Sequence, residues 1–207
     1  MASVSLKHIY KKYPGGVTAV SDFNLEIKDK EFLVLVGPSG CGKTTTLRMV
    51  AGLEEISEGE LFIGDQLVND VAPKDRKIAM VFQNYALYPH MSVFENMAFS
   101  LTLLREDPNV IHEKVMAAAE ILGLTDQLNK KPKQLSGGQN QRVALARALI
   151  KNPVMVLFDE PFSNIDPALR TQLRLLVKKI HDAFGCTILF VTHDKADLEY
   201  ADKIVYL

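Results

Sequence analysis

The sequence predicts an α/β fold with a mainly parallel sheet, an N-terminal antiparallel β subdomain and an inserted helical subdomain. Short apolar runs of strand length recur along the chain, as in 32–36 and 155–158, and such runs are typical of buried parallel strands. Alternating apolar and polar residues near the N-terminus indicate an antiparallel sheet with one buried face. Between 82 and 153, apolar residues recur at helical spacing, which predicts the inserted helices.

The N-terminal part begins with two predicted strands. Residues 4–10 alternate, with Val4, Leu6, His8 and Tyr10 on one face, and a Pro-Gly-Gly turn follows at 14–16. This pattern predicts an antiparallel strand. A second alternating stretch, around Leu25, leads through a polar turn into the apolar run 32–36. We expect that run to be a buried central strand.

The remaining elements follow in chain order. Residues 44–53 have no helix breaker before Gly52, which predicts a helix. A hairpin is predicted over 59–68, and further short buried strands over the apolar runs 77–82, 155–158, 187–191 and 203–207. Two helical stripes are formed by Ile111, Val115, Ala119 and Leu122, and by Val143, Ala146, Leu149 and Ile150. We therefore place the helical subdomain, with its adjoining segment, at about 84–152 of a single domain, 1–207.

The composition is that of a folded chain with balanced charge. The 207 residues include 24 Lys and Arg and 25 Asp and Glu, a formal net charge of −1. Such a balance argues against sequence-independent binding of nucleic acid, which depends on cationic surfaces. The apolar runs are far shorter than the roughly 18 residues that span a bilayer, and residues 1–13 do not resemble a secretion signal. We expect a cytoplasmic chain with no direct nucleic-acid partner.

A glycine-rich stretch between the predicted strand 32–36 and the next helix predicts a phosphate-binding loop. It matches the pattern G-x-x-x-x-G-K-[ST] with Gly37, Pro38, Ser39, Gly40, Cys41, Gly42, Lys43 and Thr44. Backbone amides of such a loop surround phosphate oxygens at the positive end of the helix. We expect Lys43 to reach the β- and γ-phosphates and Thr44 to bind Mg²⁺, with Thr45 also in the nucleotide site. The alternative is an ordinary glycine turn with a solvated lysine.

Two adjacent acids follow the apolar run 155–158. Asp159 and Glu160 thus stand at the carboxyl end of a predicted buried strand, where α/β sheets bind their ligands. We expect Asp159 to serve the metal and Glu160, pointing the other way by strand alternation, to polarise a water. Without the phosphate loop, a simple strand end followed by a turn would be the preferred interpretation.

A second glycine motif opens a predicted helix over 140–151. Residues 135–139 read Leu-Ser-Gly-Gly-Gln, so that Ser136 is a candidate helix cap with free amides after it. An ordinary glycine-containing cap is the alternative. Together, the ordered motifs of nearly the whole chain resemble the ATP-binding cassette family, whose core is that of a P-loop NTPase. In that family, this stretch completes the ATP site of a partner subunit; here it comprises Ser136, Gly137, Gly138 and Gln139.

The resemblance implies roles for four further residues. Tyr13 is similar to the aromatic residue that stacks on adenine, and Gln83 to the glutamine that touches Mg²⁺ and the attacking water. The stretch Ser163-Asn164-Ile165-Asp166 resembles a loop that contacts the partner ATPase, with Asp166 as its acid. His193 matches a histidine that reaches the γ-phosphate. Taken singly, each has an ordinary alternative: a strand-end tyrosine, an isolated glutamine, a solvated turn, or a solvated histidine.

The family resemblance also implies a function. Residues 83–96 look most like the corresponding segment in ATPases of bacterial sugar importers. We therefore expect a motor subunit at the cytoplasmic face of the membrane, forming a homodimer around two MgATP and driving permease subunits that a solute-binding protein serves. Relatives of that kind continue beyond this length, so we expect a longer native chain. Two alternatives are a soluble cassette ATPase acting on nucleic acid or ribosomes, and a regulator that binds ATP without hydrolysing it.

Overall fold

The computed structural model describes residues 3–163 and 165–207, without the side chains of Ala168 and Phe184. Asn164, which the sequence places in the loop before Asp166, lies outside the described residues. The chain divides into two compact units. The first contains the chain as far as Met80, Val154–Glu160 and Val177–Leu207; the second contains Val81–Pro153 and Pro161–Leu176.

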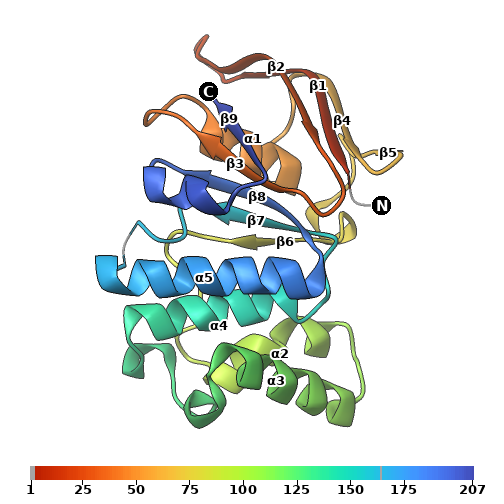
Figure 1. Cartoon of the computed structure of the whole chain (residues 1–207). Coiled ribbons are helices and arrows are strands. Elements are labelled where there is room, and N and C mark those ends of the chain that lie inside the picture. The colour runs from red at the N-terminus through yellow and green to blue at the C-terminus, as the bar shows by residue number, and fades with distance from the viewer. Residues whose placement is uncertain (1–2, 164) are drawn as a thin grey trace. The chain divides into compact units, whose positions relative to one another are not determined.

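The first unit is built on two sheets (Figure 1). The antiparallel sheet has the order β2-β1-β4-β5, made of β1 (Val4–Lys12), β2 (Thr18–Ile27), β4 (Glu58–Ile63) and β5 (Gln66–Leu67). The second sheet has the order β6-β7-β8-β3-β9, made of β3 (Phe32–Val36), β6 (Ile78–Val81), β7 (Met155–Asp159), β8 (Thr187–Thr192) and β9 (Lys203–Tyr206). Strands β7, β8, β3 and β9 pair in parallel. The predicted α/β architecture is confirmed.

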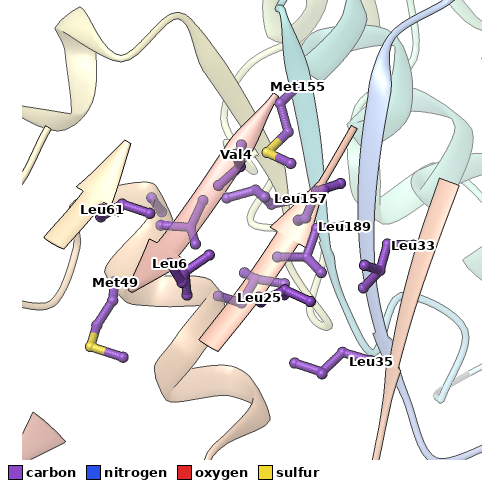
Figure 2. Close-up of a cluster of buried hydrophobic side chains, with 14 of the residues drawn as sticks. Val4, Leu6, Leu25, Leu33, Leu35, Met49, Leu61, Met155, Leu157 and Leu189 are labelled. Atoms are coloured by element: carbon purple, nitrogen blue, oxygen red, sulfur yellow. The ribbon is translucent and has the colours of Figure 1, made fainter. Parts of the chain in front are cut away.

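A hydrophobic core joins the two sheets to helix α1 (Lys43–Ala51). Helix α1 packs against β7 and β8 of the parallel sheet and against β2 of the antiparallel sheet. Figure 2 shows side chains from both sheets and from α1 in one cluster, including Leu6, Leu25, Met49, Leu157 and Leu189. Burial of these apolar surfaces is the main stabilising contribution, and it holds the beginning of α1 at a defined place relative to the parallel strands.

The alternation predicted for β1 is wrong beyond Leu6. The pairing of β1 with β2 shifts register between Leu6 and Ile9, where His8 has a φ of 51°. Ile9, expected on the polar face, is fully buried, whereas His8 is exposed. An extra residue in a strand reverses the faces of all residues after it. As a consequence, Lys11 is buried, with 8% of its surface exposed.

The shift in β1 is matched by a glycine in the neighbouring strand β4. Gly59 has a φ of 99°, and a Cβ there would lie 2.6 Å from the carbonyl oxygen of Lys7 and also too close to that of His8. Only glycine fits both the backbone conformation and this close approach. The irregular register of β1 is therefore supported from the strand beside it.

The second unit contains the helices α2 (Val93–Leu103), α3 (Pro108–Leu122) and α4 (Gly137–Leu149). Each has a side-chain cap at its N-terminus, from Ser92, Asp107 and Ser136 respectively. The buried residues of α3 are those of the stripe predicted from the sequence, and the second stripe is buried along α4 and its C-cap. These helices pack on one another.

One helix lies outside every segment that the sequence predicts to be helical. Helix α5 (Pro167–Phe184) is divided between the two units. Leu173, Val177 and Ile180 are buried along it, at the spacing of one helical face, and that spacing is the signal that would have identified it. Short 3₁₀ turns complete the chain at η1 (Pro73–Asp75), η2 (Thr125–Gln127), η3 (Pro132–Gln134) and η4 (Lys195–Tyr200).

Candidate functional site

The glycine-rich loop connects β3 to α1, as the sequence predicts. Helix α1 begins at Lys43, one residue earlier than expected, and Gly42 before it has a φ of 99°. A Cβ on Gly42 would lie 2.5 Å from the carbonyl oxygen of Ala19 in β2. The loop is thus packed directly against the start of β2, and a side chain at this position would displace it.

Lys43 is folded against its own loop. Its Nζ atom donates hydrogen bonds to the carbonyl oxygens of Gly37 at 2.7 Å and Pro38 at 2.8 Å, and lies 3.9 Å from Sγ of Cys41. Only 5% of the lysine is exposed. The ammonium group is therefore held at the beginning of α1, where the free backbone amides of the helix favour an anion.

Thr44 and Asp159 bring α1 and β7 together. The Thr44 hydroxyl donates a 2.8 Å hydrogen bond to Oδ1 of Asp159. Burial raises the pKa of Asp159, an effect opposed by the hydrogen bond from Thr44 and by the positive charges of Arg48 and Lys43. One carboxylate beside one hydroxyl fits Mg²⁺, which keeps several waters and takes one or two protein ligands together with substrate phosphates.

Glu160 and His193 form a second pair. Oε2 of Glu160 lies 3.1 Å from Nδ1 of His193, which follows the end of β8. Glu160 does not obtain its direction from strand alternation, because β7 ends at Asp159 and Glu160 itself has a φ of 44°. Its amide donates to the carbonyl oxygen of Val191 in β8. The carboxyl ends of two parallel strands therefore present an acid and an imidazole at the same edge of the sheet.

Tyr13 lies at the end of β1, in the turn that connects it to β2. The amide of Tyr13 donates to the carbonyl oxygen of Val17. The first residues of β2 pair with the end of β1, and one of them, Ala19, is the residue packed against Gly42. This turn therefore stands beside the phosphate loop, within the first unit.

The second glycine motif forms the first turn of α4. Ser136 and Gln139 make a capping box, in which the Gln139 amide donates to Ser136 Oγ at 3.3 Å and the Ser136 amide to Gln139 Oε1 at 2.9 Å. The predicted Ser136 cap is confirmed. The helix begins at Gly137 and not near Asn140, because the capping hydrogen bonds include both glycines in its first turn. A Cβ on Gly138 would collide with the side chain of Leu169.

The remaining predicted residues of the second unit lie in loops. Gln83 is exposed and lies two residues beyond the end of β6. Asp166 immediately precedes α5, where its carbonyl oxygen accepts from the amide of Arg170. The guanidinium of Arg170 in turn donates to the carbonyl oxygens of Ile165 and Ser163. Arg170 therefore holds the loop before α5 in shape.

Comparison with known proteins shows the family to which the chain belongs. The model of the family described as "ABC transporter" matches residues 20–163. The chain belongs to the ABC transporter family. No helix in residues 3–163 and 165–207 is long and apolar enough to cross a membrane.

Relatives of this ABC chain include two from bacteria. It is 56% identical to the multiple sugar-binding transport ATP-binding protein MsmK of Streptococcus mutans and 56% identical to the oligosaccharides import ATP-binding protein MsmX of Bacillus subtilis. Both alignments cover 100% of this chain but only 55% and 57% of the relatives. The chain thus spans little more than half the length of these curated relatives.

The cassette fold is confirmed by solved structures. Two dimeric structures of the ABC transporter cassette MJ0796, one of them bound to ADP and Pi in a post-hydrolysis state, are 33% identical to this chain. Their TM-scores are 0.87 and 0.88, and each match covers 99% of this chain and 94% of the other.

Three residues of this cassette were missed by sequence reasoning. Arg147 of α4 donates to the carbonyl oxygens of Tyr85 at 3.0 Å and Ala86 at 2.7 Å, two residues with positive φ. It thereby fixes the segment after Gln83 to the helix that begins at the second glycine motif. Lys11 and Glu54 form an ion pair of 2.9 Å beside Tyr13. No local pattern indicates either contact, because each joins segments far apart in the sequence.

Proposed function

We propose that this cassette binds MgATP, hydrolyses it, and serves as the motor subunit of an importer. The observation that carries the proposal is the convergence of five side chains at one edge of the parallel sheet. Lys43 and Thr44 come from the start of α1, Asp159 and Glu160 from the end of β7, and His193 from the end of β8. Each of these side chains has the charge or the hydrogen-bonding group that phosphoryl transfer requires at its position.

The phosphate loop would hold the triphosphate. Lys43 would exchange its bonds to the carbonyl oxygens of Gly37 and Pro38 for bonds to the β- and γ-phosphates, which are stronger because both partners are charged. The loop from Gly37 to Gly42, together with Thr44 and Thr45, supplies amides to phosphate oxygens. Thr44 and Asp159 would hold Mg²⁺ within the first unit, and the proposed role of Gln83 in metal binding rests on the family resemblance alone. When bound, the metal neutralises the negative charge on the β- and γ-phosphates.

Glu160 is the residue proposed to act on the attacking water. Its carboxylate accepts a proton as the water oxygen bonds to the γ-phosphorus, and the bond to the β–γ bridging oxygen breaks, releasing inorganic phosphate and leaving the electron pair on ADP. His193, 3.1 Å from Glu160, orients that carboxylate and reaches the γ-phosphate. Both groups are present, which argues against a regulator that binds ATP without hydrolysing it.

The second glycine motif is proposed to complete the site of a second copy. The capping box leaves the first amides of α4 available to an anion, and Ser136, Gly137, Gly138 and Gln139 would contact the γ-phosphate bound by the partner. Asp166 would lie at the same interface. The dimeric structures of MJ0796 support the pairing of two cassettes.

Sugar or oligosaccharide uptake is the proposed process. The supporting observation is the 56% identity to MsmK and MsmX, whose names describe sugar-binding transport and oligosaccharide import. The cassette would act at the cytoplasmic face of the membrane, on permease subunits that receive the solute from a binding protein. Residues 83–96, which Arg147 holds at Tyr85 and Ala86, are the proposed contact with the permease.

Two measurements test this function in the complete protein. The purified protein should release phosphate from MgATP, and a tagged copy expressed in its native cell should co-purify with integral membrane proteins. Absence of hydrolysis in the presence of those membrane partners would contradict the motor assignment. Co-purification with ribosomes or nucleic acid in place of membrane proteins would favour the alternative of a soluble cassette.

A further inference from the structure

We propose that Lys11 and Glu54 are positioning residues that hold the Tyr13 ring in place as the platform for the nucleotide base. The inference rests on the proposed binding of MgATP, with Tyr13 as the residue that the family resemblance assigns to stacking on adenine, and adds the residues that fix this platform. It predicts that the pair sets affinity for the base and leaves affinity for the phosphates unchanged.

The first observation is a buried lysine with a complete set of partners. The side chain of Lys11 is 10% exposed, and its Nζ atom lies 2.9 Å from Oε1 of Glu54 and donates to the carbonyl oxygen of Glu55 at 2.8 Å. Burying an ammonium group costs free energy unless it is paired and hydrogen-bonded. The register shift of β1 at His8 places the lysine here, although alternation along the strand would leave it on the surface.

The second observation is the position of the aromatic ring. Nζ of Lys11 lies 5.0 Å from the centre of the Tyr13 ring, within the range of a favourable cation–π contact. The pKa of Glu54 is lowered, most by its contact with Lys11. The ammonium group of Lys11 therefore contacts both the Glu54 carboxylate and the Tyr13 ring, while the ring remains partly exposed and keeps surface for stacking.

The third observation is that the pair ties the ring to the helix of the phosphate loop. Glu54 and Glu55 lie two and three residues beyond Gly52, the C-cap of α1. The same helix begins at Lys43, and Gly42 before it is packed against Ala19 of β2. The hairpin that carries Tyr13 is thus attached to both ends of α1. We infer that this double attachment sets the distance between the base platform and the phosphate loop.

Stacking on an aromatic face accepts every base. The Lys11–Glu54 pair should therefore raise affinity for nucleoside triphosphates in general and should not select adenine over guanine. Inorganic tripolyphosphate has phosphates and no base. Its affinity therefore shows whether a substitution acts on the base platform or on the phosphate loop in general.

The experiment compares MgATP with magnesium tripolyphosphate in the complete protein, using titration calorimetry. Lys11→Met keeps the apolar length of the side chain and removes its charge, so we expect MgATP affinity to fall about 3- to 10-fold and tripolyphosphate affinity to remain unchanged. Lys11→Arg should retain most of the affinity for MgATP. The matched control is Lys12→Met, because Lys12 pairs with Glu58 at 2.6 Å and lies over the Tyr10 ring, yet is exposed.

Tyr13→Ala separates failure of this inference from failure of the proposed base platform. If Tyr13→Ala weakens MgATP binding and Lys11→Met does not, the positioning role is wrong and the platform stands. If Tyr13→Ala has no effect, the platform itself is wrong. Equal losses of MgATP and tripolyphosphate affinity in Lys11→Met would also overturn the inference, since they indicate a general structural role. In the double variant that combines Lys11→Met with Tyr13→Ala, we expect no loss of MgATP affinity beyond that of Tyr13→Ala alone.

Discussion

The hydroxyl of Thr44 donates a 2.8 Å hydrogen bond to the carboxylate of Asp159, a residue 115 positions further along the chain. This contact joins the first turn of α1 to the end of β7. It places one neutral and one acidic oxygen side by side at the edge of the sheet, next to the backbone amides of the phosphate loop. The proposed metal position depends on this contact.

Asp159→Asn should uncouple stability from metal binding. Asparagine keeps the oxygen that accepts from Thr44 and removes a charge that burial disfavours, so Tm without ligand should rise by about 2–4 °C, as for ~1 kcal/mol in a protein of this size. Magnesium-dependent ATP binding should weaken strongly, because the carboxylate is lost. Thermal melts and ATP titrations with and without Mg²⁺ measure the two effects.

The stability gain of Asp159→Asn should depend on pH. Burial raises the pKa of Asp159 above its ordinary value of 3.8, so the ionised form costs the folded state free energy. That cost is fully present above the folded pKa, declines as the pH falls below it, and is gone below the ordinary value of 3.8. The difference in Tm between variant and wild type should therefore narrow on acidification. A difference that widens at low pH would contradict the burial argument.

Glu160→Gln should separate hydrolysis from binding. Glutamine preserves the size of the side chain but cannot accept the proton of water, so turnover should fall by about 10²–10⁴ while MgATP still binds. The trapped nucleotide should then hold two copies together, which size-exclusion chromatography of the complete protein with ATP detects. Asp159→Asn is the matched control and should give no such dimer. Hydrolysis at the wild-type rate would remove Glu160 from its proposed role.

Lys43→Ala should abolish tight ATP binding with a small effect on stability. Within residues 3–163 and 165–207, the ammonium group bonds to two carbonyl oxygens of its own loop and, more weakly, to Cys41, so its loss costs roughly 1–2 kcal/mol of unfolding free energy. Fluorescent-nucleotide binding measures the affinity, and thermal melts measure the stability. An unchanged affinity in a folded variant would exclude the phosphate-loop assignment.

Ser136→Arg tests whether the second glycine motif acts across a dimer. The substitution removes the capping hydroxyl of α4 and places a bulky cation where the partner's γ-phosphate is expected, so hydrolysis should stop while each monomer still binds ATP. Mixing this variant with Lys43→Ala should restore part of the activity, because the mixed dimer keeps one site with an intact loop and an intact motif. No recovery, with mixed dimers demonstrated, would mean that the motif does not act in trans.

Alkylation should distinguish the two cysteines. Cys41 lies in the phosphate loop and is partly exposed, whereas Cys186 is buried and burial raises the pKa of its thiol. A maleimide should therefore react first at Cys41 and block ATP hydrolysis sterically, and MgATP should protect. Peptide mapping after brief labelling locates the modified residue. Cys41→Ser provides the control, since it should become resistant to inactivation; labelling that begins at Cys186 would contradict the structure.

The sequence by itself determined the features that depend on near neighbours. The phosphate loop, the Ser136 cap and the stripe from Ile111 to Leu122 were predicted at their observed places. A glycine turn, a capping hydrogen bond and a helical face each involve residues within a few positions of one another, so local spacing carries the information.

The tertiary structure alone decided the contacts between distant segments. The burial of Lys11 depends on the register shift of β1, which Gly59 of another strand accommodates. Glu160 turns towards His193 through a positive φ, supported by a hydrogen bond from its amide to β8. In both cases a backbone irregularity overrides the alternation of a strand, and its position is set by packing against residues far away in the sequence. Such packing becomes defined only when the sheets assemble.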